Sequence, residues 1–317
     1  MSLALVIPVR DDQERLNRLL HQAAQSGVFD QVVICDDGSQ DPVTIDREIG
    51  LGNRVTLLRH KQSQGPGIAR NRALAKVRTT HMLYFDSDDC LTGELPLLWQ
   101  DLQGEDFDFC LFRHHDSRND RWGQMPIDNA LWRRAGAGPA SLFEPDRAAL
   151  LALAQTANYP WNKIYRTGFL RDHKLQCAEV PLHEDIPLHW QSFLQAERVL
   201  ASDRVAAVHF VQDSGQRMTN QSGAERLCVF EPLGTVAESL ADSGNTGLTM
   251  AFFDFTSGLL DWVRAALDPL LRDVMDHRTG TFLKTHLAPG IFDRIARTDP
   301  VLALRLVLQM AGRRAPC

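Results

Sequence analysis

Apolar runs and amphipathic segments alternate through the first ninety residues, and this alternation constrains the fold more than any other feature of the chain. Four short runs are rich in β-branched and aliphatic residues, which is typical of strands covered on both faces. They lie at 3–9, 32–35, 55–59 and 81–85. Helix-start signals follow the first three runs, at Asp11-Asp12, at Asp41-Pro42 and at Gly65. This order predicts an α/β fold with a mostly parallel sheet flanked by helices.

Three of the predicted strands end in polar residues that are unusual for a buried sheet. These stretches are Pro8-Val9-Arg10-Asp11, Asp36-Asp37-Gly38-Ser39 and Asp86-Ser87-Asp88-Asp89. In open α/β sheets, ligands bind beyond the carboxyl ends of the strands, which meet along one edge. We therefore expect a binding site at this edge.

The third stretch places three carboxylates, Asp86, Asp88 and Asp89, within four positions. Like charges this close repel each other, and burial increases the repulsion. Asp86 and Asp88 can point the same way because side chains alternate along an extended chain. Paired carboxylate oxygens suit a hard divalent cation, Mg²⁺ or Mn²⁺, which would neutralise them. A solvated acidic turn is the alternative, and for an isolated D-x-D pattern it is the favoured one.

Beyond residue 91 the chain divides into a mixed part and a helical part. The predicted strands are at 107–115 and 204–211, and the predicted helices at 146–157, 183–199, 223–242, 247–277, 279–296 and 300–311. Residues 121–141 are punctuated by Gly and Pro and predict a loop with short pieces. We therefore place an α/β domain at 1–215 and a helical C-terminal region at 216–317.

Composition excludes several other classes of protein. The chain has 317 residues, a net charge of −6 and 44% hydrophobic residues, which is ordinary for a soluble globular protein. Because it has no strong basic block, nucleic acid is not expected as a partner. The six cysteines show no C-x-x-C spacing, so a reducing cytoplasm is the expected location. The N-terminal apolar run is too short to span a membrane and lacks the features of a signal peptide.

Five stretches together resemble the family 2 glycosyltransferases, which have the nucleotide-sugar-binding fold called GT-A. They are VIPV (6–9), VVICDDGSQD (32–41), GPGIARN (65–71), YFDSDD (84–89), and PWNKIYRTGFL (160–170) followed by HED (183–185). The resemblance covers roughly the first 200 residues, and its strength is that the motifs occur in the family's order. It implies transfer of a sugar from a nucleoside-diphosphate donor, a UDP-sugar in the first place, to a hydroxyl acceptor with inversion. Surface polysaccharide or glycolipid assembly is the setting that the family suggests.

The resemblance also implies roles for residues on the donor side. Pro8, Val9, Asp11, Asp37, Arg70 and Asp86 fall where the family binds the nucleotide sugar. Asp37 can accept the imide N–H of uracil, although D-G-S also favours a plain turn. Arg70 lies near the nucleotide in the family, or it braces Asp37 or Asp86 as a buried ion pair. Asp88 is the expected main metal ligand, with Asp86 and Asp89 beside it, for Mn²⁺ or Mg²⁺.

The family places its catalytic base in a Glu-Asp pair after the W-N-K stretch. Here the pair is Glu184-Asp185, of which Asp185 is the first candidate and Glu184 the second. The same residues would also begin a helix well, because acids are favoured at its N-terminus. Trp161, Asn162 and Lys163 are expected to shape the acceptor side or to pack beneath it. His209 could reach the metal, but a lone histidine is more often structural.

Departures from the family pattern leave other functions open. Arg10-Asp11 replaces the usual Tyr-Asn, Ser63 replaces an asparagine, and only Arg217 remains of an arginine-rich segment. A degenerate transferase that binds a nucleotide sugar without turnover is therefore one alternative. A D-x-D phosphatase is less favoured, because its nucleophile follows the first strand of the core, and a dinucleotide enzyme lacks its G-x-G-x-x-G. The C-terminal helices could form a homodimer, contact a carbohydrate or lipid-linked acceptor at the inner face of the membrane, or simply pack as core.

Overall fold

The computed structural model describes the chain except for residues 120–121, 137, 139–141, 212–221 and 313–317. Its centre is a nine-stranded sheet with the order β3-β2-β1-β4-β8-β6-β9-β5, and β7 pairs with β9. The first four strands are β1 (Leu3–Val9), β2 (Gln31–Asp36), β3 (Val55–Arg59) and β4 (His81–Tyr84). The pairings among these four strands are all parallel, as the alternation of strands and helices predicts.

The second half of the sheet mixes strand directions. β8 (Lys163–Arg166), which the sequence did not reveal as a strand, runs antiparallel between β4 and β6 (Phe109–Asp116). β9 (Val199–His209) is parallel to β6. The short strands β5 (Cys90–Leu91) and β7 (Leu142–Phe143) run antiparallel to β9.

Helices cover both faces of the sheet, and each face has its own hydrophobic core. One face is covered by α1 (Gln13–Ser26) and α3 (Glu94–Asp101), and the other by α2 (Pro66–Leu74), α4 (Pro126–Arg134), α5 (Arg147–Leu153), α6 (Thr167–Asp172) and α7 (Asp185–Gln195). In α1, Leu16, Leu19 and Leu20 are fully buried. Each such leucine stabilises the fold by roughly 1.5–3 kcal/mol.

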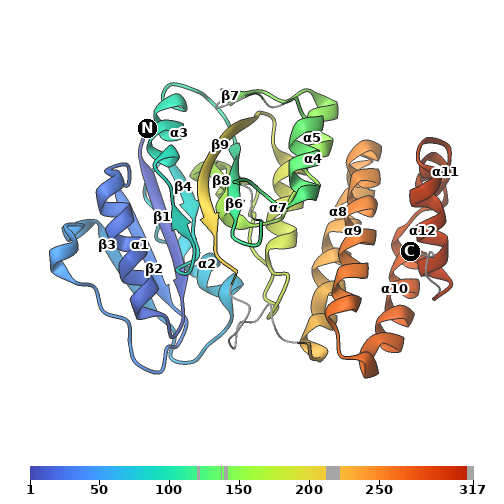
Figure 1. The fold of residues 1–317 in the computed structure, drawn as a ribbon, viewed down its shortest axis with the longest axis horizontal. Coiled ribbons are helices and arrows are strands. Elements are labelled where there is room, and N and C mark those ends of the chain that lie inside the picture. Colours follow the sequence, from blue (N-terminus) through green and yellow to red (C-terminus); the bar gives the residue numbers. More distant parts are fainter. Residues whose placement is uncertain (120–121, 137, 139–141, 212–221, 313–317) are drawn as a thin grey trace.

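The C-terminal region is helical, as predicted. After a 3₁₀ turn at Ala224–Val229 it consists of α8 (Phe230–Ser243), α9 (Thr246–Ala266), α10 (Arg272–His286), α11 (Pro289–Thr298) and α12 (Pro300–Met310). Figure 1 shows these helices beyond α7, at the opposite end of the molecule from β3. No helix among the described residues is long and apolar enough to cross a membrane.

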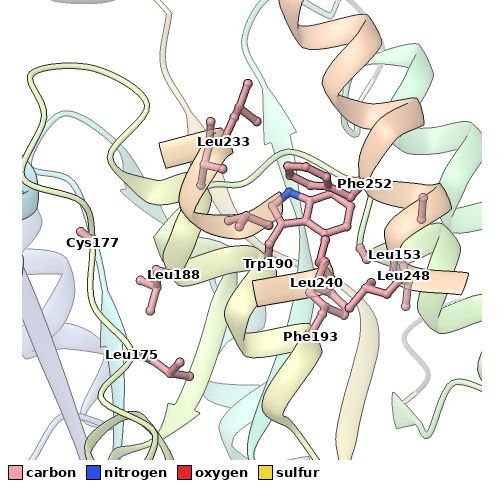
Figure 2. Close-up of a cluster of buried hydrophobic side chains, with 14 of the residues drawn as sticks. Leu153, Leu175, Cys177, Leu188, Trp190, Phe193, Leu233, Leu240, Leu248 and Phe252 are labelled. Carbon is pink, nitrogen blue, oxygen red and sulfur yellow. The ribbon is translucent and has the colours of Figure 1, made fainter. Parts of the chain in front are cut away.

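The C-terminal helices share a core with the sheet domain through α7. Trp190 of α7 meets Phe252 of α9 edge to face, with ring centroids 5.1 Å apart (Figure 2). Leu233 and Leu240 of α8 belong to the same buried cluster. The predicted boundary at 215 lies outside the described residues, as does Arg217, so the division into domains stays a prediction.

The structure differs locally from the predictions in several places, and the predicted helix at 247–277 is interrupted between Ala266 and Arg272. No α-helix follows Asp41-Pro42, where only short 3₁₀ turns occur, at Arg47–Ile49 and Gly52–Arg54. The backbone N–H of Val43 binds Asp36 Oδ2 at 3.3 Å and that of Thr44 binds Gln13 Oε1 at 2.7 Å, so side chains hold the segment in an irregular path. Conversely, α4 forms inside the Gly/Pro-punctuated segment for which a loop with short pieces was predicted. Its proline is at the first helical turn, where a missing N–H costs nothing.

Candidate active site

The polar ends of β1, β2 and β4 lie side by side at one edge of the sheet, as predicted. Val9 is paired in register with Asp36, and the N–H of Asp37 donates to the carbonyl of Val9 at 2.8 Å. The N–H of Phe85 donates to the carbonyl of Val6 at 2.8 Å, which extends the alignment to β4. The side chains of Pro8 and Val9 are buried. A ligand at this edge would therefore meet the loops that follow the strands.

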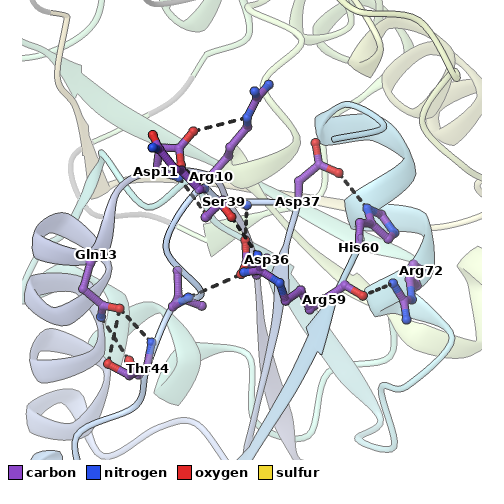
Figure 3. Close-up of polar contacts among 12 residues, drawn as sticks. Arg10, Asp11, Gln13, Asp36, Asp37, Ser39, Thr44, Arg59, His60 and Arg72 are labelled. Carbon is purple, nitrogen blue, oxygen red and sulfur yellow. Dashed lines mark hydrogen bonds and ion pairs between the residues drawn. The ribbon is translucent and has the colours of Figure 1, made fainter. Parts of the chain in front are cut away.

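The turn after β2 is organised by Asp36, whose side chain is buried (Figure 3). Its carboxylate accepts from the N–H of Ser39 at 2.8 Å and pairs with Arg59. Burial alone would raise the pKa of Asp36, but the hydrogen bonds from Ser39, Val43 and Arg59 lower it. Ser39 Oγ in turn accepts from the N–H of Asp11 at 2.9 Å. Asp11 is thereby fixed beside the turn.

Asp37 binds the loop that leads into α2. His60 Nδ1 donates to Oδ1 at 2.6 Å, and Ser63 Oγ donates to Oδ2 at 2.7 Å. The N–H groups of Gln64 and Gly65 complete the set, each at 2.9 Å. Burial would raise the pKa of Asp37, but these four donors, His60 foremost, lower it. Because a carboxylate has about four lone-pair directions, its acceptor capacity is used within the protein. This favours the turn-organising role for Asp37, and the uracil contact stays a prediction.

Two residues that depart from the family pattern contact each other at this place. Arg10 Nη1 donates to Ser63 Oγ at 3.0 Å. Ser63 Oγ also donates to Asp37, so the two departures meet beside the residue for which a contact with the base was predicted. His60 was missed by sequence reasoning, and its only signal was its position directly after the third predicted strand.

Arg70 joins the acidic turn after β4 to the segment before α7. Its Nη2 donates to Asp86 Oδ1 and its Nη1 donates to Glu184 Oε1, both at 2.6 Å. The arginine side chain is 4% exposed. Burial opposes its charge, but Asp86 and Glu184 outweigh this and raise its pKa further above the ordinary value. Arg70 thus forms ion pairs with two carboxylates. Asp86 is one of the two partners that the sequence suggested, and Glu184 is a partner that it did not suggest.

The first turns of α2 also hold the segment that carries Glu184. Asn71 Nδ2 donates to the carbonyl of Cys177, and the N–H of Cys177 donates to Asn71 Oδ1, both at 2.9 Å. A Cβ at Gly67 would lie 2.3 Å from the carbonyl oxygen of Ala178. Only glycine therefore permits this close approach. Sequence reasoning did not identify Asn71, whose signal was its place in the A-R-N motif.

The acidic turn brings Asp86, Asp88 and Asp89 together. One carboxylate oxygen from each lies within 4.8 Å of the other two, which confirms the predicted cluster. Asp89 is fully buried, and burial raises its pKa against the opposing effect of His209. Its Oδ1 is within 2.9 Å of His209 Nδ1, whereas its Oδ2 is buried without a hydrogen-bond partner. A buried carboxylate oxygen without a donor fits a cation ligand, so these residues suit a divalent metal.

His209 is a partner of this cluster. Burial disfavours its imidazolium, but the hydrogen bond and charge of Asp89 outweigh burial and raise its pKa. Its ring packs on Tyr159 at 4.8 Å and on Trp161 at 5.4 Å between centroids. His209 therefore contacts Asp89 directly, and a contact of its own with a metal stays a prediction.

Asp185 and Glu184 differ sharply in their surroundings. Asp185 is the first residue of α7, and the residue as a whole is partly exposed to solvent. Burial of its carboxylate and the neighbouring charge of Glu184 raise its pKa to about 7, against the opposing charges of Arg70 and Lys163. Glu184 is held by Arg70, whereas Asp185 has a pKa suited to a base at neutral pH. The ion pair of Glu184 with Arg70 and the raised pKa of Asp185 together favour Asp185 over Glu184 as the candidate base.

Trp161, Asn162 and Lys163 lie beneath the site. Their side chains are 0%, 1% and 0% exposed. Trp161 stacks on Tyr159 with ring centroids 4.6 Å apart, and Lys163 Nζ donates to Asn162 Oδ1 at 2.6 Å. Burial lowers the pKa of Lys163 to about 7. Of the two roles that the sequence left open, this burial favours packing over contact with an acceptor.

The fold and its acidic edge define a GT-A-type α/β protein. The family model of glycosyl transferase family 2 matches residues 4–173, which is more than half of the chain, and the chain belongs to this family. It is 37% identical over 87 residues to the pre-mycofactocin glycosyltransferase of Mycobacterium tuberculosis, a match that covers 27% of this chain and 18% of that protein.

Proteins of Staphylococcus aureus provide a longer match. The chain is 23% identical over 232 residues to the poly(ribitol-phosphate) β-N-acetylglucosaminyltransferase TarS, which covers 69% of this chain and 37% of that protein. The crystal structure of TarS 1–349 in complex with UDP-GlcNAc has a TM-score of 0.73 and 17% identity, over 98% of this chain and 89% of that one. At this identity the likeness concerns the fold. The chain spans less than half the length of both curated relatives.

Proposed function

We propose that this protein is an inverting glycosyltransferase that moves a sugar from a nucleoside-diphosphate donor to a hydroxyl acceptor. The acceptor oxygen forms a bond to the anomeric carbon, the bond from that carbon to the diphosphate breaks, and the acceptor proton passes to Asp185. The nucleoside diphosphate leaves with the bonding electrons. Family membership supports the class of reaction, and the arrangement of this chain's own side chains supports the roles.

The observation that carries the proposal is the double ion pair of Arg70. It brings the acidic turn after β4 and the start of α7, two motifs far apart in the sequence, to one place at the sheet edge. A donor site and a base must lie this close, because transfer needs the acceptor oxygen and the anomeric carbon within reach of each other. Because Arg70 is buried, it also holds Asp86 and Glu184 in fixed positions.

Asp86, Asp88 and Asp89 would hold a divalent cation, Mn²⁺ or Mg²⁺. When bound there, the ion supplies positive charge that stabilises the diphosphate leaving group. The role of this chain is to present clustered oxygens at the strand end, with Asp89 fixed by His209.

A UDP-sugar is the donor that we propose first, since a solved structure of the same fold holds UDP-GlcNAc. The acceptor that we propose is a carbohydrate or lipid-linked hydroxyl in surface polymer assembly. The name of the relative TarS supports a polymer, since it gives poly(ribitol-phosphate). A homodimer or a peripheral membrane contact would use the C-terminal helices. Their exposed apolar side chains include Val301, Leu304 and Leu270.

The test is calorimetric titration of the protein with UDP-GlcNAc, UDP-glucose and the GDP- and dTDP-sugars, each with and without Mn²⁺. We expect binding of a UDP-sugar that depends on the cation, and proton NMR of the transferred product should show inversion at the anomeric carbon. A protein that binds the donor without hydrolysing or transferring it is a degenerate transferase. Absence of binding for the whole panel overturns the proposal.

A further inference from the structure

We propose that Trp122 and His115 form a stacking platform that binds a sugar ring of the acceptor, an inference that rests on the proposed function. The two rings are stacked, with centroids 4.5 Å apart and planes inclined by 16°. Trp122 is 64% exposed, an unusual state for the largest apolar side chain. With His115 against one side of the indole, a broad apolar surface is still open to a ligand.

The platform is held in place by the chain around it. The N–H of Gly123 donates to His115 Nδ1 at 3.0 Å, which fixes the imidazole ring of the stack. The N–H of Asp116 donates to the carbonyl of Gly123 at 3.0 Å, and Asn119 Nδ2 donates to the carbonyl of Gln124 at 2.7 Å. A ring that is already ordered loses little conformational entropy when a ligand stacks on it.

The platform is connected to the metal-binding edge by the pairing of β6 with β9. Asp116 is paired in register with His209, and the N–H of Ser117 donates to the carbonyl of His209 at 3.0 Å. His209 Nδ1 contacts Asp89 of the acidic turn. The platform therefore lies at the end of β6, beside the end of β9 whose His209 contacts Asp89.

The strand order separates the platform from the nucleotide half of the sheet. Of the predicted nucleotide residues, Pro8, Val9, Asp11 and Asp37 lie at the ends of β1 and β2. The platform lies at the end of β6, on the other side of β4 and its acidic turn. A ligand at Trp122 is therefore on the acceptor side of the cluster. Trp161, the aromatic residue that the motifs suggested for this side, is fully buried and cannot stack on an acceptor.

A sugar ring is the ligand that this chemistry fits. One face of a pyranose presents C–H groups, which pack on the electron-rich face of an indole, while its hydroxyls stay hydrated or bind nearby polar groups. A flat apolar peptide surface would instead need a wider apolar patch around Trp122. The residues directly next to it in sequence, Arg121 and Gly123, are charged or small, and Ile127 is the exposed large apolar residue nearest to it in sequence among the described residues.

The experiment compares Trp122→Ala, Trp122→Phe and a control, Ile127→Ala, with the wild type. Ile127 is 71% exposed on α4, close in sequence, and stacks on no ring among the described contacts. The probes are methyl β-glucoside, methyl β-N-acetylglucosaminide and methyl β-galactoside, whose binding is measured by saturation-transfer NMR and by indole fluorescence. We expect at least one glycoside to bind the wild type, at least tenfold weaker binding in Trp122→Ala, and recovery to within about threefold in Trp122→Phe.

A separate titration with UDP-GlcNAc and Mn²⁺ distinguishes this inference from the proposed function. If donor binding is absent in every protein but glycoside binding still depends on Trp122, the proposed function fails and the platform stands. Unchanged glycoside binding in Trp122→Ala overturns the platform, as does a wild type that binds none of the three glycosides. An equal loss of donor and glycoside binding also overturns it, because it would mark Trp122 as structural.

Discussion

Arg70 and Glu184 are 114 residues apart in the chain, and their side chains meet at 2.6 Å in a pocket that leaves the arginine 4% exposed. The other arm of the same guanidinium binds Asp86. One side chain thus links the predicted metal-binding turn to Glu184, the residue next to the candidate base Asp185. We expect the two parts of the site to respond together when this link is cut.

Replacement of Arg70 should destabilise the fold as well as the site. Arg70→Ala leaves Asp86 and Glu184 partly buried without a counter-charge, and such a loss costs about 3–5 kcal/mol. Arg70→Lys is the matched control, because a lysine keeps the charge but cannot bind both carboxylates with a planar fork. Urea unfolding should rank the wild type above Lys and Lys above Ala. A free energy of unfolding within about 1 kcal/mol of wild type for Arg70→Ala would show that the link is not structural.

The rate of transfer should rise with pH through about 7. Burial and the charge of Glu184 raise the pKa of Asp185 to about 7, and only its ionised form can accept a proton. The pH profile of kcat/KM should therefore fall on the acid side of this value and level off above it. In Glu184→Gln the nearby negative charge is gone, so the pKa of Asp185 falls and the acid limb moves to lower pH.

Asp185→Asn is the matching variant for the base. It should keep binding of UDP-GlcNAc but lose about 10²–10⁴-fold in transfer rate, the usual contribution of a general base. An acid limb that persists in a fully active Asp185→Asn would assign the base to another group.

The acidic turn should carry the metal dependence of donor binding. Asp88→Ala removes one of three clustered oxygens, so the affinity for UDP-GlcNAc should no longer increase with Mn²⁺. Asp242→Asn, an exposed carboxylate on α8, is the control for a general loss of negative charge. Calorimetry with and without Mn²⁺ compares the two variants. If Mn²⁺ increases the affinity for UDP-GlcNAc equally in Asp88→Ala and in the control, the assignment is contradicted.

Substitution by alanine should lower the stability of the protein at Gly67 and raise it at Gly258. In Gly67→Ala the new Cβ would lie 2.3 Å from the carbonyl oxygen of Ala178, so the segment leading to Glu184 must shift. We expect lower thermal stability and a slower reaction. A Cβ at Gly258, exposed in α9, meets nothing within 4 Å, and alanine there should stabilise the helix by about 0.5–1 kcal/mol. Equal melting temperatures for the two variants would show that the close approach at Gly67 is not required.

The strands and helices of the sheet domain could be predicted because the spacing of apolar residues in the sequence indicates which side chains are buried. Runs such as 3–9 and 32–35 are buried throughout, and parallel strands bring their polar ends to one edge whatever the loops do. The acidic cluster was predictable for the same reason. Spacing within a turn keeps Asp86, Asp88 and Asp89 close in any fold that ends β4 at Tyr84.

Contacts between segments that are far apart in the sequence could not be predicted. The pairing of His60 with Asp37 and of Asn71 with Cys177 depends on how loops pack, and the local sequence around His60 and Asn71 does not indicate these partners. The sequence left Lys163 open between shaping the acceptor side and packing beneath it. Lysine is rarely buried, yet Lys163 is 0% exposed and its Nζ donates to the oxygens of Tyr159 and Asn162. The pairing of Trp122 with His115 likewise required the turn after β6 to be known.

The most direct test of the central claim is anomalous diffraction from crystals soaked with Mn²⁺ and UDP. The account predicts a manganese peak in contact with carboxylate oxygens of the acidic turn, with the diphosphate bound to it and Asp185 on the open side of the site. A manganese peak elsewhere, or UDP bound away from this turn, would contradict it.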